Sequence, residues 1–251
     1  MGRKRLLPGL TVKDGFMRHP FDAEHHVQTS GLVPGRHLSI GHPNDPHSTA
    51  YYGIAPSVFQ ELLAIWRPMR LHGPLSRYTF IDFGAGMGRA MLLASRLPFA
   101  EVVGVESHPD LAAIARKNIL RWQADGRARC PLRILRQDAL EFQFPANPCV
   151  AYLFNPFRVP VLQALRDKME NDFATRPGQL DLLYANHEFE DLFRLSHRWS
   201  ALWAHDIPLS LEDEQADRAI LNNQPDGEYA STVEEPCSIY RCIAQPPPLA
   251  A

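Results

Sequence analysis

The sequence predicts an α/β fold, in which a seven-stranded, mostly parallel sheet carries helices on both faces and follows an irregular N-terminal arm. Three observations support this prediction. From residue 78 onward, short apolar runs alternate with amphipathic stretches, a pattern typical of strands joined by crossover helices. A glycine-rich turn follows the first of these runs directly. The first 50 residues hold many glycines, prolines and histidines but no sustained periodicity.

The arm is expected to precede the globular part of the chain. We assign residues 1–55 to the arm, which has room for one short helix, and residues 56–251 to the α/β domain. Apolar residues recur at helical spacing from Val58 to Trp66, and Pro68 ends this pattern. We expect the arm to fold over a neighbouring surface of the domain.

The alternating region predicts the strands and helices of the domain in order. A helix is expected over residues 89–97, and a second begins after Ser107, a capping residue that precedes Pro109 in the first turn. Another helix carries an apolar face within residues 162–173. The last strands are expected to be mixed in direction. The expected strands are residues 79–83, 101–106, 132–135, 150–154, 179–184, 197–205 and 238–243.

Charge is unevenly distributed along the chain. The formal net charge is only −2, which excludes a polycation that coats nucleic acid without regard to its sequence. Residues 206–236 hold most of the local imbalance, because Arg218 is the single basic residue among many acidic ones. We interpret this acidic segment as a solvated loop or hairpin inserted in the domain.

Composition also limits location and chemistry. No apolar run approaches the roughly 20 residues that cross a bilayer, and no signal-peptide pattern follows the basic start. The four cysteines form no Cys-x-x-Cys pair, and the histidines of the arm show no zinc-like spacing. We therefore expect a reduced cytoplasmic protein with no membrane partner and no metal site.

The glycine-rich turn is the sharpest local signal. A turn that joins a strand to a helix without side chains lets a ligand approach the backbone, while the helix start offers free N–H groups to an anion. The dinucleotide-binding fingerprint would require a third glycine at position 89, where this chain has an arginine. The turn reads Asp82-Phe83-Gly84-Ala85-Gly86-Met87-Gly88-Arg89.

The spacing of these glycines, with an acid at position 82, resembles motif I of class I (Rossmann-like, seven-strand) S-adenosylmethionine-dependent methyltransferases. The resemblance continues at the ends of the next three predicted strands, with Glu106, then Gln137-Asp138, then Asn155-Pro156-Phe157. It is closest to bacterial members of unassigned substrate. These positions lie at the carboxyl edge of the predicted sheet, where open α/β sheets bind ligands. A nicotinamide dinucleotide remains the alternative cofactor.

The resemblance implies a cofactor, S-adenosylmethionine, and residues that would hold it. Glu106 would accept hydrogen bonds from the ribose, Asp138 would face the adenine amino group, and Asp82 would meet the amino group of the methionine end. An aromatic ring from the arm, Tyr52, would lie near the sulfonium, although it is equally well explained by ordinary packing. The glycines Gly84, Gly86 and Gly88 would let the cofactor approach.

The resemblance also bears on the reaction. Asn155 and Phe157 are implied as catalytic residues that orient a methyl acceptor, which we expect to be a nitrogen atom of a protein or a small molecule. One proline is missing from the loop that holds amino groups in related enzymes. A nucleic-acid base methyltransferase and a non-catalytic cofactor-binding protein therefore remain alternatives. His187, after the fifth strand, fits a proton acceptor or a helix cap equally well.

Overall fold

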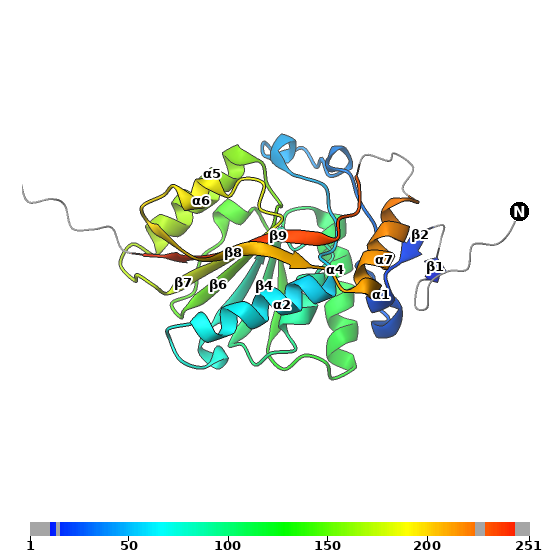
Figure 1. The fold of residues 1–251 in the computed structure, drawn as a ribbon, viewed down its shortest axis with the longest axis horizontal. Helices are drawn as coiled ribbons and strands as arrows, with labels where there is room; N and C mark the ends of the chain where they lie inside the picture. Colours follow the sequence, from blue (N-terminus) through cyan, green and yellow to red (C-terminus); the bar gives the residue numbers. More distant parts are fainter. Residues whose placement is uncertain (1–10, 14–15, 224–228, 244–251) are drawn as a thin grey trace, which may run out of the picture.

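The computed structural model describes residues 11–13, 16–223 and 229–243, and its centre is a seven-stranded sheet (Figure 1). In this sheet β9 runs in the opposite direction to the other six strands and pairs antiparallel with both β7 and β8. The predicted sheet, including its mixed final strands, is confirmed. In spatial order the strands are β5 (Leu132–Arg136), β4 (Glu101–Glu106), β3 (Thr79–Phe83), β6 (Cys149–Phe154), β7 (Leu180–Ala185), β9 (Glu234–Cys242) and β8 (Trp199–Pro208).

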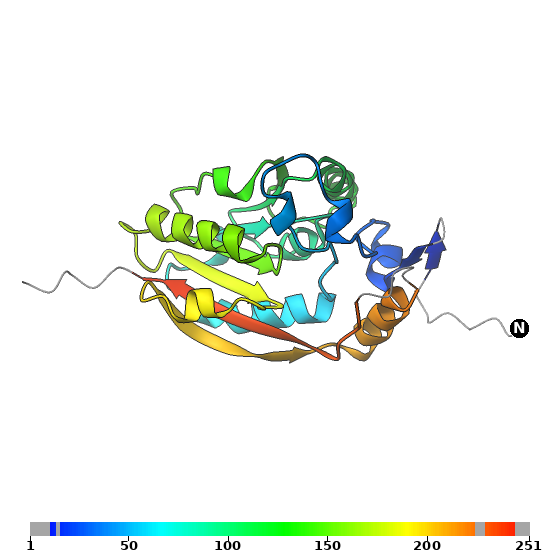
Figure 2. The same cartoon turned by 90° about the horizontal axis from the view of Figure 1, so that it is seen from above.

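Helices cover both faces of the sheet because its central strands are buried on both sides (Figure 2). One face packs against α2 (Pro56–Trp66), α3 (Arg89–Ala94) and α4 (Pro109–Ala124). The other face packs against α5 (Val159–Asp172) and α6 (Asp191–Arg194). Short 3₁₀ turns complete the connections at Arg67–Met69, Leu75–Arg77 and Ala139–Glu141. Within the described chain, no helix combines the length and apolarity that crossing a membrane requires.

The described part of the arm contains more regular structure than its composition predicts. It contains a small hairpin, β1 (Thr11–Lys13) with β2 (Phe16–Arg18), followed by the expected short helix, α1 (Pro20–His25). Two 3₁₀ turns follow, Gly35–His37 and Asp45–His47. In both views the arm lies at the end of the molecule where the parallel strands finish (Figures 1 and 2).

The interpretation of the acidic segment as a solvated loop or hairpin is wrong, because much of it forms a helix, α7 (Leu211–Leu221). The Ser210 hydroxyl accepts a hydrogen bond from the Asp213 amide and caps this helix. Acidic residues in a first helical turn interact favourably with the helix dipole, which explains why an acid-rich sequence is helical here. In Figure 1, α7 lies beside α1 and β2 of the arm.

Candidate functional site

The glycine-rich turn leaves β3 and enters α3 at the carboxyl edge of the sheet. Gly84, Gly86 and Gly88 all have positive φ angles, of 72°, 53° and 90°, a region that disfavours residues with a side chain. The Gly84 and Ala85 amides donate hydrogen bonds to the Val105 carbonyl of β4, at 2.9 and 3.1 Å. The predicted turn is thus confirmed as a tight bend that folds back onto the neighbouring strand.

Parts of the chain itself lie against these glycines. A Cβ atom at Gly84 would overlap with the Pro156 side chain, and one at Gly86 would overlap with the Tyr51 ring. At Gly88 a Cβ would lie 3.4 Å from the Ala115 Cβ, so this glycine allows α3 to pack against α4. The glycines are therefore explained first by close contacts within the chain.

Glu106, at the end of β4, is buried and hydrogen-bonded. Its two carboxylate oxygens accept from the Gly86 and His108 amides, each at 2.8 Å. Burial raises the pKa of this carboxyl, while the amide hydrogen bonds oppose that shift. Each carboxylate oxygen can accept a second hydrogen bond, and Glu106 lines a cavity. It can therefore still accept hydrogen bonds from a diol.

Asp138, after β5, is held by the arm. One carboxylate oxygen caps a 3₁₀ turn by accepting from the Leu140 amide at 2.8 Å. The other accepts from the Asn44 side-chain amide at 2.9 Å and lies 3.4 Å from His42 Nε2. Residues of the arm thus face the carboxylate that was predicted to face an adenine amino group.

Asp82 lies below the edge rather than at it. The residue is only 3% exposed and does not line either cavity of the site. Burial, together with the charge of Glu106, raises the pKa of the Asp82 carboxyl to about 8. At neutral pH this carboxyl is therefore mostly protonated.

Two adjoining cavities lie above the edge. The smaller has a volume of about 90 Å³; the larger has a volume of about 990 Å³. Tyr52 and Phe154 line both. The smaller cavity is lined by Gly84, Glu106, Asp138, Phe157 and residues of the arm, and the larger by Asn155, Asn186, Glu188, Asp217 and Glu235, among others.

Two residues that line the larger cavity have a strained backbone conformation. Asn155 and Asn186, which follow the adjacent strands β6 and β7, have φ angles of 41° and 50°. Among the described residues, His26 is the only other non-glycine residue with a positive φ. Such strain tends to cluster at functional sites. Asn186 was not among the predicted site residues, and its backbone conformation is the signal that identifies it.

Hydrogen bonds fix the conformation of Asn155. Its side-chain oxygen accepts from the Tyr184 hydroxyl at 3.2 Å, and its main-chain oxygen accepts from the Thr49 hydroxyl at 2.6 Å. The residue is 6% exposed. Phe157, the other predicted catalytic residue, faces the smaller cavity and not the larger one. The two residues thus lie on different sides of the boundary between the cavities.

Carboxylates from the acidic segment line the larger cavity. Asp217 accepts a hydrogen bond from the Tyr52 hydroxyl at 2.7 Å, and burial raises the pKa of Asp217. Burial, followed by the charge of Asp217, raises the pKa of Glu235 to about 8. A pKa near 8 suits a group that exchanges protons near neutral pH. Sequence pattern does not indicate this role, because acidic runs usually remain solvated.

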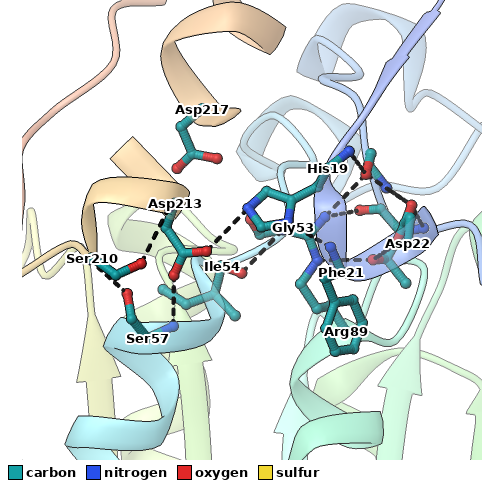
Figure 3. Close-up of polar contacts among 12 residues, drawn as sticks. His19, Phe21, Asp22, Gly53, Ile54, Ser57, Arg89, Ser210, Asp213 and Asp217 are labelled. Carbon is teal, nitrogen blue, oxygen red and sulfur yellow. Dashed lines mark hydrogen bonds and ion pairs between the residues drawn. The ribbon is translucent and has the colours of Figure 1, made fainter. Parts of the chain in front are cut away.

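Arg89 fastens the arm to the glycine-rich turn (Figure 3). Its guanidinium donates to the carbonyls of Thr29, Gly53 and Ile54, and to the hydroxyls of Thr29 and Ser30. Thus one side chain, at the position where a dinucleotide fingerprint requires glycine, binds both ends of the segment between residues 30 and 53.

A second set of contacts joins the arm to α7 (Figure 3). His19 Nε2 lies 3.2 Å from the Asp213 carboxylate, which also accepts from the Ser57 amide at 2.8 Å. These contacts lower the pKa of Asp213, although burial acts in the opposite direction. Arm, α2 and α7 are therefore joined through one buried carboxylate.

The predicted site residues separate into two groups. Gly84, Glu106, Asp138, Tyr52, Asn155 and Phe157 line the cavities, whereas Asp82, Gly86 and Gly88 do not. His187 does not line them either; its Nδ1 lies 2.9 Å from the Ser238 hydroxyl. The structure adds residues that the sequence did not indicate, principally His42, Asn44, Thr49, Asn186, Asp217 and Glu235.

No profile of a known protein family matches this chain, and no curated protein has a significantly similar sequence. Solved structures are similar in fold. The [4+2]-cyclase SpnF matches with a TM-score of 0.52 and 12% identity, over 76% of this chain and 82% of its own. A candidate RNA methyltransferase from Pyrococcus horikoshii matches with a TM-score of 0.50 and 14% identity, over 74% of this chain and 83% of its own. An RNA methyltransferase from Salinibacter ruber, solved with S-adenosylhomocysteine, matches with a TM-score of 0.48 and 19% identity, over 77% of this chain and 95% of its own.

The chain has the fold of class I S-adenosylmethionine-dependent methyltransferases. The strand order, with β9 inserted antiparallel between β7 and β8, is the order of that fold. One of the similar structures is a cyclase, so the fold alone does not decide the reaction.

The residues of the edge fit S-adenosylmethionine in chemistry, while the smaller cavity is too narrow to receive it. Glu106 retains acceptor capacity at the cavity, and the bend at Gly84 brings backbone to the same wall. A cavity of about 90 Å³ is well below the roughly 300–1,000 Å³ typical of ligand sites. The arm residues that face Asp138 account for part of this restriction.

Proposed function

We propose that this protein is an S-adenosylmethionine-dependent methyltransferase that acts on a nitrogen nucleophile of a protein or a small molecule. The observation that carries the proposal is the alignment of Glu106, Asp138 and Asn155 along one sheet edge, at two adjoining cavities. Glu106 would hold the ribose, Asp138 the adenine amino group, and the backbone at Gly84 the region nearest the methionine end. When bound, the cofactor would supply an electrophilic methyl group.

The larger cavity supports an amine acceptor. An amine is protonated at neutral pH and must lose a proton before its lone pair can attack. Glu235 and Asp217 line this cavity. Glu235, with a pKa of about 8, would take up the proton in its ionised form, the fraction of which increases as the pH rises toward 8. Asn155 would orient the nitrogen. Positioning supplies most of the rate in such transfers.

Transfer from radiolabelled S-adenosylmethionine tests this function. The purified protein is incubated with separate pools of small amines, peptides, and RNA or DNA, with Asn155→Ala as the matched control. The proposal expects label on an amine or peptide nitrogen that depends on Asn155. Label in nucleic acid alone would support the base methyltransferase instead. Cofactor binding without any label would indicate a non-catalytic binding protein.

A further inference from the structure

The arm crosses the sheet edge as a loop with fixed ends and a middle of low burial. Val33 and Tyr51 pair through two main-chain hydrogen bonds of 2.9 Å, and Arg89 binds the segments just outside this pair. Between them, residues 34–50, here named the arm loop, contain no fully buried residue. Segments of low burial open at low free-energy cost.

The first contact of the arm loop occupies the carboxylate proposed to bind adenine. Asn44 donates its side-chain N–H to Asp138 at 2.9 Å, and His42 lies 3.4 Å from the same oxygen. The other oxygen of Asp138 is already bonded to the Leu140 amide. An amide N–H₂ group and an adenine amino group are alike as donors, so Asn44 satisfies Asp138 in the way a bound adenine would.

The second contact lies at the strand end proposed to hold the acceptor. Thr49 donates its hydroxyl to the Asn155 carbonyl at 2.6 Å and its amide to the Pro156 carbonyl at 3.2 Å. The Arg158 amide donates to the His47 carbonyl at 2.8 Å. The arm loop therefore supplies N–H and O–H donors to carbonyls that an incoming amine would approach.

We propose that the arm loop is an internal plug, in which Asn44 and Thr49 occupy the hydrogen-bonding positions of the two substrates. This inference rests on the proposed function. The loop must leave Asp138 and the ends of β6 before the narrow cavity can receive a nucleoside, while Tyr51, Tyr52 and the Arg89 contacts remain in place.

The arm loop and a bound ligand would compete for the same hydrogen-bonding groups. A ligand that binds only the open form has an apparent affinity reduced by the fraction of molecules that are open. Removing the Asn44 amide weakens the closed form and leaves Asp138 intact. Asn44→Ala should therefore bind more tightly, which is the opposite of what a direct contact to the cofactor would give.

The test is calorimetric titration of S-adenosylhomocysteine into the full-length wild type, Asn44→Ala and Asn223→Ala. The last variant removes an exposed asparagine side chain that donates to the Ala219 carbonyl and, at 3.2 Å, to Met17 Sδ; both partners lie outside the arm loop. We expect Asn44→Ala to bind roughly three- to tenfold more tightly than wild type, and Asn223→Ala to bind as wild type does. Equal or weaker binding by Asn44→Ala, with wild type binding normally, overturns the plug.

Amide hydrogen exchange gives a second readout. On addition of S-adenosylhomocysteine, the Thr49 and Arg158 amides should exchange faster, because their partners in this structure are separated, while the Tyr51 amide at the base stays protected. Slower exchange at Thr49 would show a lid that closes on the ligand, and would overturn the plug. If neither wild type nor Asn44→Ala binds, the proposed function itself has failed, and the plug fails with it.

Discussion

The two halves of the sheet edge are built differently. At the ends of β3, β4 and β5, a continuous turn and two carboxylates contribute to a small cavity of about 90 Å³, and both carboxylates, Glu106 and Asp138, already have partners within the chain. At the ends of β6, β7 and β9, the larger cavity of about 990 Å³ is assembled from segments distant in sequence. The groups predicted in the first half come from strand-end motifs, with the arm completing the cavity wall, whereas most of the second half is organised by tertiary packing.

This difference indicates how the cofactor and the acceptor would each be recognised. A nucleoside cofactor is recognised by a few groups at fixed spacing, so a short motif encodes its site. An acceptor is recognised by the shape and charge of a space enclosed by several elements, here including the arm and α7. Substitutions in one half at a time separate these two kinds of recognition.

The largest expected effect is in the larger cavity. Asn155→Ala should lower the rate of methyl transfer by about 10²-fold or more, with cofactor affinity unchanged, measured by single-turnover labelling. Because Asn155 has a φ of 41°, Asn155→Gly serves as a control that tolerates this backbone. Both variants should show this loss in the rate of methyl transfer. A Gly variant within a few-fold of wild type would show that only the backbone matters.

The second-largest effect is expected where Arg89 connects the arm to the glycine-rich turn. Arg89→Met leaves several buried carbonyls and hydroxyls without a donor, so we expect a loss of about 3 kcal/mol in the free energy of unfolding, measured in urea. Arg133→Met, which removes an exposed ion pair to Glu101, should cost less than about 1 kcal/mol. Equal losses in the two variants would contradict the role given to Arg89.

The glycine-rich turn provides a matched pair of substitutions. Sequence alone suggests that a side chain at Gly86 would block the cofactor while sparing the fold, but the Tyr51 ring makes the fold sensitive as well. Gly86→Ala should lower the free energy of unfolding by about 2 kcal/mol, beyond the strain of a positive φ. Gly31→Ala shares a positive φ, and its Cβ would meet no atom within 4 Å. We expect a smaller loss in the free energy of unfolding for Gly31→Ala. The difference between the two variants then measures the cost of the overlap with Tyr51.

The smallest effect depends on pH. Because burial raises the pKa of Asp82 to about 8, the folded state holds this proton more tightly than the unfolded state, and stability falls as pH rises toward and through 8. Asp82→Asn should therefore gain about 1–2 kcal/mol relative to wild type between pH 7 and pH 9. Thermal unfolding at both pH values measures this. Glu141→Gln, at an exposed carboxyl, should show no such difference.

Much of the first half could be predicted from the sequence. Alternating apolar runs predict the strands, and the strand ends indicate Glu106 and Asp138 here and Asn155 in the second half, because the carboxyl ends of parallel strands meet at one edge. The contacts made by Asn44 and Thr49 could not be predicted, since they join residues 94 and 106 positions apart. Local periodicity carries no information about such pairs. Whether residues 1–55 act as a cover for a cofactor stays a prediction.

The acidic segment shows why much of the second half could not be predicted. Its charge pattern is that of a solvated surface, but Asp213 and Asp217 are buried because His19, Ser57 and Tyr52 reach them from elsewhere in the chain. Burial of an acid depends on partners that tertiary structure supplies. Only the structure reveals that this segment contributes a wall of the cavity.

Calorimetric titration of the wild type with S-adenosylhomocysteine and NAD in parallel, repeated on Glu106→Ala, tests the central claim most directly. We predict that S-adenosylhomocysteine binds one site per chain, that NAD does not bind, and that loss of the Glu106 carboxylate weakens binding by about tenfold or more. Binding of NAD in preference, or S-adenosylhomocysteine affinity unaffected by Glu106→Ala in a folded variant, would contradict the assignment of this sheet edge.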